Sequence, residues 1–140
     1  MDSLHYIKEN LVINLYSIYM IIEIDDTKTI GDIQDKFNEF FPFLQLEFYK
    51  EPHHWYEGSA ERVSIPTENK VGEVRTLHEH GDLEIHSWSR TGDLEEEFRK
   101  RFGLFVQVLR RQGDEWLQTI RTDKLSLQEQ NELGRKTQIP

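Results

Sequence analysis

The chain has 140 residues, no cysteine and a net charge of −9 at pH 7, from 17 basic and 26 acidic residues. This length is typical of one domain with a single hydrophobic core. The lack of cysteine excludes disulfides, a thiolate nucleophile and thiolate metal sites, and it fits a reducing, cytoplasmic compartment. The acidic balance disfavours phosphate backbones, so we expect no nucleic-acid partner.

The N-terminal residues 1–19 differ from the rest of the chain. The stretch Leu11–Ile24 is largely apolar, but polar residues interrupt it and it is shorter than the about 20 apolar residues that span a membrane. It lacks a signal-peptide cleavage site as well, so we expect no membrane association. Two alternatives stay open: residues 1–19 pack on the domain as an extra element, or the natural protein begins at Met20. We expect a single domain over residues 20–135 and a frayed tail over residues 136–140.

One stretch of sequence occurs twice, sixty-one residues apart. Residues 21–41 read IIEIDDTKTIGDIQDKFNEFF and residues 82–102 read DLEIHSWSRTGDLEEEFRKRF. Both predict a short apolar strand, a polar turn and a helix, and an alternating strand follows each helix. The residues that this pattern predicts for the core are Ile22, Ile24, Ile33, Phe37, Phe41, Leu44, Leu46, Leu83, Ile85, Leu94, Phe98, Phe102, Val106 and Val108.

Several residues indicate where these elements begin and end. Thr29 is the expected N-cap of the first helix and Gly103 the residue that ends the second. Val71–Val74 repeats part of the first helix start and predicts a short further helix. Ser126 predicts a capping box for a last helix that ends at Gly134.

Two strand–helix–strand units and a further hairpin strand over residues 115–120 predict an α+β fold. We expect duplicated β-α-β units in a ferredoxin-like sandwich, with both helices on one face of the sheet. The alternative is a ubiquitin-like β-grasp, in which one helix packs across a mixed sheet. The sequence leaves the strand order open.

Three segments in order, TIGDIQDKFNEFFPFLQLEF, GDLEEEFRKRFGLFVQVLRRQGDEWLQT and LSLQEQNELGR, resemble a group of small uncharacterised bacterial proteins. The resemblance covers about Met20 to Arg135. Because that group has no assigned activity, the resemblance implies no functional residues. It does imply a chain that begins near Met20.

No nucleophile elbow, phosphate loop or linked Ser-His-Asp spacing is present in the sequence, so we expect neither enzymatic activity nor a cofactor. The aromatic residues Trp55, Tyr56 and Trp88 occur in polar segments. Exposed aromatic side chains anchor protein interfaces, which predicts a non-enzymatic interaction or accessory protein with an unidentified protein partner. The alternative is that the long 51–69 connection folds these side chains over the sheet. The oligomeric state is open.

Histidine supplies the second hypothesis for a site. His53, His54, His78 and His80 lie in or after the long connection, near several glutamates. Imidazole and carboxylate groups suit zinc, nickel or copper. The alternative function is therefore a metal- or small-ligand-binding protein that uses residues 51–86. The spacing matches no metal motif, however, and loop histidines are commonly just solvated.

Overall fold

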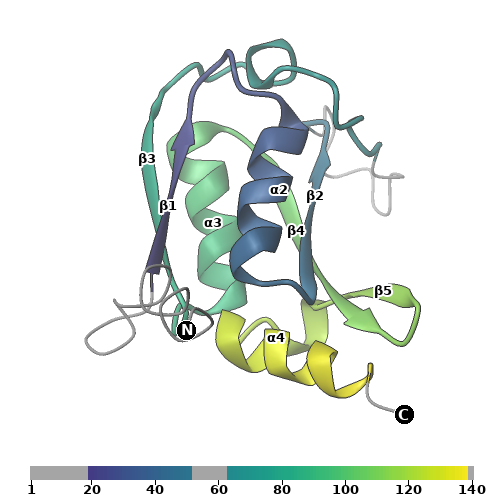
Figure 1. Ribbon diagram of the computed structural model, residues 1–140. Helices are drawn as coiled ribbons and strands as arrows, with labels where there is room; N and C mark the ends of the chain where they lie inside the picture. Colours follow the sequence, from purple (N-terminus) through teal and green to yellow (C-terminus); the bar gives the residue numbers. More distant parts are fainter. Residues whose placement is uncertain (1–18, 52–62, 139–140) are drawn as a thin grey trace, which may run out of the picture.

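The computed structural model describes residues 19–51 and 63–138 (Figure 1). The predicted sites at His53, His54, Trp55 and Tyr56, and the N-terminal extension up to residue 18, lie outside the described residues. The elements are β1 (Tyr19–Ile24), α2 (Ile30–Phe40), β2 (Leu44–Tyr49), the 3₁₀ helix η2 (Val71–Glu73), β3 (Gly81–His86), α3 (Thr91–Phe102), β4 (Phe105–Gln112), β5 (Glu115–Gln118), the 3₁₀ helix η3 (Ile120–Thr122) and α4 (Leu127–Lys136).

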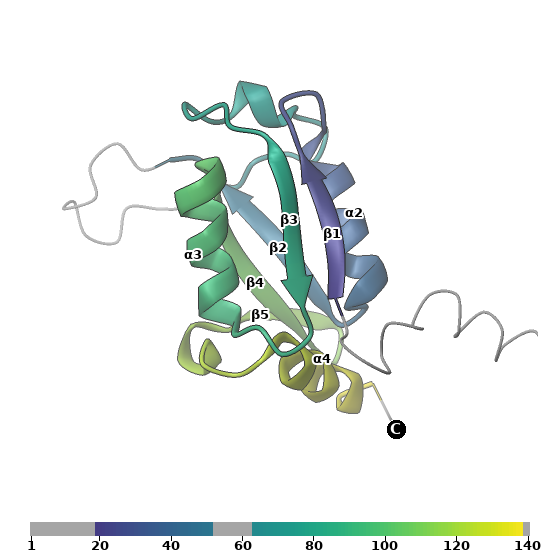
Figure 2. The ribbon, with the colours of Figure 1, turned by 90° about the vertical axis from the view of Figure 1, so that its left-hand side faces the viewer.

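The described strands form two antiparallel sheets, and each sheet takes strands from both repeats. β1 pairs with β3, while β4 lies between β2 and β5. The two sheets face each other, with α2 and α3 on opposite sides of the space between them and α4 across one end (Figures 1 and 2). The expected α+β class is confirmed. The ferredoxin-like arrangement is not confirmed, because these strands pair in two sheets and the two helices lie on opposite sides.

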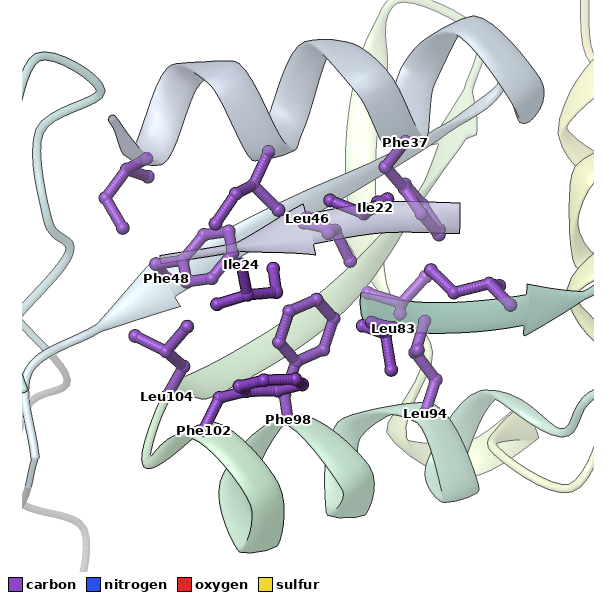
Figure 3. Close-up of a cluster of buried hydrophobic side chains, with 14 of the residues drawn as sticks. Ile22, Ile24, Phe37, Leu46, Phe48, Leu83, Leu94, Phe98, Phe102 and Leu104 are labelled. Carbon is purple, nitrogen blue, oxygen red and sulfur yellow. The ribbon is translucent and has the colours of Figure 1, made fainter. Parts of the chain in front are cut away.

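The core lies between the two sheets and the two central helices (Figure 3). All the predicted core residues are buried except Val106, which is partly buried against the cluster. Equivalent phenylalanines from the two helices, Phe37 and Phe98, point into this core from opposite sides. Phe98 meets the ring of Phe48 edge to face, with ring centroids 5.8 Å apart. The helical period of each repeat therefore predicted the buried face of each helix.

The predicted helix ends are largely confirmed. The Thr29 and Ser126 side chains each accept the N–H of the third helical residue in a complete capping box. Gly103 ends α3 with a φ of 63°, in the left-handed region. The short helix predicted at Val71 is η2. The last helix, however, continues to Lys136, two residues beyond the predicted end.

The glycines that begin both central helices allow a close backbone contact. The N–H of Gly31 donates to the carbonyl of Thr67 at 2.8 Å, and the N–H of Gly92 donates to that of Asp123 at 2.9 Å. A Cβ on Gly31 would lie 3.2 Å from the Thr67 oxygen. The start of α2 is thus tied to the turn before η2, and the start of α3 to the turn after η3.

Each central helix also covers the edge of the strand that follows it. On α2, the Gln34 amide donates to the carbonyl of Leu46 at 2.9 Å. Sixty-one positions later on α3, the Glu95 carboxylate accepts the N–H of Val108 at 2.9 Å. The two units therefore share an edge-covering contact, although the polarity of the hydrogen bond is reversed.

Candidate interaction surface on the β1–β3 sheet

The β1–β3 sheet has one buried and one exposed face, because successive side chains of a strand point to opposite sides. Its inward residues belong to the core. We call the opposite side the outer face, and Figure 2 looks onto it: none of the described helices crosses it. The outer face consists of Tyr19, Ile21, Glu23, Asp82, Glu84 and His86, together with Trp88 in the following turn.

Aromatic rings form a row at one end of the outer face. The ring of His86 lies 5.6 Å from that of Tyr19 and stacks on Trp88 at 4.5 Å, with 24° between the two planes. Trp88 is nevertheless 63% exposed, and Ile21 on the neighbouring strand is 45% exposed. This end of the face therefore presents a large aromatic and an aliphatic side chain to solvent.

Backbone hydrogen bonds hold the turn that carries Trp88. The carbonyl of Ser87 accepts the N–H of Gln128 at 2.9 Å, and the carbonyl of Ser89 accepts the N–H of Leu127 at 2.9 Å. Both donors lie in the first turn of α4. The tryptophan is thus presented from a turn that is fixed on both sides, which reduces the entropy lost when a partner contacts it.

His86 connects the aromatic row to the acidic part of the face. Its Nε2 lies 2.9 Å from a carboxylate oxygen of Glu84, while its Nδ1 is buried without a hydrogen-bond partner. An ionised carboxylate can accept a hydrogen bond but cannot donate one. A neutral imidazole at this position therefore carries its proton on Nε2. This bond and the stacking on Trp88 fix the orientation of the imidazole.

Acidic side chains occupy the rest of the outer face. Glu23 lies opposite Asp82 in the strand register, and Ile21 lies opposite Glu84. The strand positions of this face carry three carboxylates and neither lysine nor arginine. Lys28, in the turn after β1, approaches Glu23 only to 3.9 Å. The outer face is consequently negative and would attract basic groups.

A shallow groove lies beside β1, between this strand and α2. Ile21, Ile22 and Glu23 form one wall, and α2 forms the other. The remaining lining residues are Lys28, Asp32, Ile33, Lys36 and Asp82. The groove and the outer face are therefore one continuous surface around β1.

The predicted metal ligand His78 lies in a different cluster. Its Nδ1 is 2.8 Å from Asp26, and the same carboxylate accepts two hydrogen bonds from the buried Arg75, at 2.7 and 3.0 Å. Arg75 also donates to the carbonyl of Phe102 at 2.9 Å, at the end of α3. The hydrogen bond from Arg75, followed by that from His78, lowers the pKa of Asp26. Through these contacts, the segment before β3 is bound to the turn that follows β1.

The other predicted site residues are only partly placed. His80 is exposed. Within residues 19–51 and 63–138, no group of three or more histidine, cysteine, aspartate or glutamate side chains could hold a metal ion. The metal hypothesis depends on His53 and His54, outside these ranges, and stays a prediction. Of the three predicted partner-binding residues, Trp88 is described and exposed.

Comparison with known proteins adds no assignment. No protein-family model, curated protein or solved structure matches this chain. The resemblance to small bacterial proteins stays a prediction. None of the described helices is long and apolar enough to cross a membrane.

Proposed function

We propose that this protein is a non-enzymatic interaction domain that binds a protein partner through the outer face of its β1–β3 sheet. The observation that carries the proposal is the exposure of Trp88, at 63%, from a turn that α4 fixes. Tryptophan is enriched among the residues that dominate binding energy, and a fixed aromatic side chain loses little entropy on binding. Ile21, on the same outer face, provides a second exposed apolar side chain.

The same proposal includes the origin and location of the protein. We propose that its two units arose by duplication, which the sixty-one-residue repeat and the equivalent contacts of Gln34 and Glu95 support. We propose a cytoplasmic location because the chain has no cysteine and an acidic charge.

Site-specific crosslinking in the cells that produce the protein tests this function. A photoreactive phenylalanine analogue replaces Trp88 in one variant and Glu115, an exposed residue of β5, in a control variant. We expect one protein to be crosslinked from position 88 and not from position 115. The affinity of that protein, once purified, should fall at least about tenfold with Trp88→Ala and stay unchanged with Glu115→Ala. Equal crosslinking from both positions, or full affinity of the Trp88→Ala variant, contradicts the proposal.

A further inference from the structure

The outer edge of β3 is closed by a side chain from α3. Arg101 donates from Nη2 to the carbonyl of Asp82 at 3.1 Å, and its Nη1 is held by Glu97 at 2.8 Å. A carbonyl that accepts from α3 points away from the paired strand β1. The ion pair between Glu97 and Arg101 thus occupies a backbone acceptor that a further strand would need.

This contact also sets the direction of the backbone groups in β1. In an antiparallel pair, two opposite residues direct their N–H and C=O groups either both toward each other or both away. Since Asp82 lies opposite Glu23, the backbone groups of Glu23 point away from β3, as do those of Ile21 two residues earlier. The other sheet follows the same rule. Leu46 lies opposite Val108, and their carbonyls accept from Gln34 and Thr119, outside the pair.

The first unit lacks residues that would close the edge of β1 as Glu97 and Arg101 close the edge of β3. The repeat places Ile21, Lys36 and Phe40 where the second unit has Asp82, Glu97 and Arg101. A phenylalanine cannot donate a hydrogen bond, so no equivalent of the Arg101 contact forms. Among the described residues, the outward backbone groups of Ile21 and Glu23 have no hydrogen-bond partner. The groove beside β1 lies along this open edge.

From this difference between the two units, we infer that the edge of β1 binds an extended segment of a partner protein by strand addition. The inference rests on the proposed interaction function and names the form of the partner. The segment would donate and accept hydrogen bonds at Ile21 and Glu23 and extend the two-stranded sheet to three strands. Main-chain hydrogen bonds supply affinity in this mode, and alternate side chains supply specificity.

An added strand would direct its side chains alternately to the outer face of the sheet and to the groove. These two surroundings determine which types of side chain the bound segment should carry. Side chains on the outer side would lie beside Glu23, whose neighbours Asp82 and Glu84 are also acidic, so they should be lysine or arginine. Side chains on the inner side would enter the groove, which the exposed Asp32 and Lys36 line together with the buried Ile22 and Ile33. Contact with the two isoleucines favours apolar side chains at these positions. The partner segment therefore alternates basic and apolar residues. A second copy fits less well, because each chain has a net charge of −9.

Amide hydrogen exchange measured by NMR tests the inference directly. The probe is a blocked peptide of alternating lysine and valine, as long as β1. In the free protein, the amides of Met20, Ile22 and Ile24 bond to β3 and should exchange slowly, while those of Ile21 and Glu23 exchange faster. A saturating amount of peptide should slow exchange at Ile21 and Glu23 by at least about tenfold. A glutamate–valine peptide, or the lysine–valine peptide with its edge-facing amides methylated, should leave both rates unchanged.

A variant in which the edge of β1 is closed in the same way as the edge of β3 provides the matched test. The double substitution Lys36→Glu and Phe40→Arg introduces the pair that closes β3, and we expect it to abolish the peptide-dependent slowing. Conversely, Arg101→Ala opens the edge of β3 and should create a second binding site, seen as slower exchange at Asp82. If the double variant does not fold, the Arg101→Ala result alone tests the reasoning. Slowing that persists in the double variant, or peptide binding without slowing at Ile21, overturns the inference.

Two further outcomes separate this inference from the proposed function. If a partner requires Trp88 but its binding leaves exchange at Ile21 and Glu23 unchanged, strand addition is wrong while the proposed function stands. If the free protein forms dimers in sedimentation experiments and the same two amides are slow only in the dimer, the occupant is a second copy and the inferred partner segment is wrong.

Discussion

The substitution Asp26→Ala tests how strongly the cluster around Arg75 stabilises the fold. The Arg75 side chain is 0% exposed, and Asp26 accepts two of its three hydrogen bonds. Removal of one partner of a buried ion pair costs about 3–5 kcal/mol, since the other charge stays buried. Because the Asp26 side chain is 40% exposed, water can replace part of its role, and we expect a loss of about 2–3 kcal/mol.

Urea unfolding at pH 7 measures this loss as a lower midpoint with an unchanged slope. The neighbouring Asp25 is the control, because its hydrogen bonds within the described residues go to Thr27 and Lys28 in its own turn. In the double variant with Arg75→Met, the Asp26→Ala change should cost little further, since its partner is already gone. Equal losses for Asp25→Ala and Asp26→Ala, or additive losses in the double variant, would refute the reasoning.

The same variant should change the acid sensitivity of the protein. Hydrogen bonds from Arg75 and His78 lower the pKa of Asp26 in the folded state. A lowered folded-state pKa contributes stability that is present above the unfolded pKa of about 3.9 and is lost as the pH falls through the folded value. The difference in unfolding free energy between wild type and Asp26→Ala should therefore be present at pH 7 and shrink below about pH 4.

Three further substitutions have expected outcomes. Gly103→Ala should destabilise more than Gly113→Ala: both have a φ near +60°, which costs about 1–2 kcal/mol, but only at Gly103 would the Cβ meet Leu77, at 2.9 Å. Comparable midpoints in urea would show that Leu77 moves aside freely. Thr29→Ala removes the N-cap of α2 and should cost about 1 kcal/mol, read from the thermal midpoint. Trp88→Ala should shift that midpoint little, since the side chain is largely exposed; a large shift would assign it a role in stability.

Local sequence patterns predicted the elements and the core, because both follow from neighbouring residues. The helical period of residues 21–41 placed Phe37 in the core, and the capping residue Thr29 placed the start of its helix. The pairing of strands did not follow, since no local signal states that Leu46 lies opposite Val108. Both sheets combine strands of different units, and that choice depends on how the two apolar faces pack together.

The candidate surface was predicted only in part, for a related reason. Trp88 was identified because a tryptophan in a polar turn is conspicuous. Ile21 was not, because β1 is apolar at most positions and its exposed side looks like its buried side in the sequence. Arg75 was also missed, since a lone arginine between elements carries no local mark of burial. His78 was predicted as a candidate metal ligand, and no local signal predicted the contact of its imidazole with Asp26.

The pairing of strands across units has a consequence for synthesis of the chain. Paired residues of β1 with β3 and of β2 with β4 are separated by 56 residues (Tyr49 with Phe105) to 67 residues (Tyr19 with His86). Neither strand of the first unit has its sheet partner until the second unit has left the ribosome. At about 5–20 residues per second, the first unit waits for several seconds before β1 and β2 meet their partner strands. During that time only the end of β2 can pair, through the bridge between Tyr49 and Ser64. Late pairing of β1 and β2 with their partner strands during synthesis is therefore a consequence of this topology.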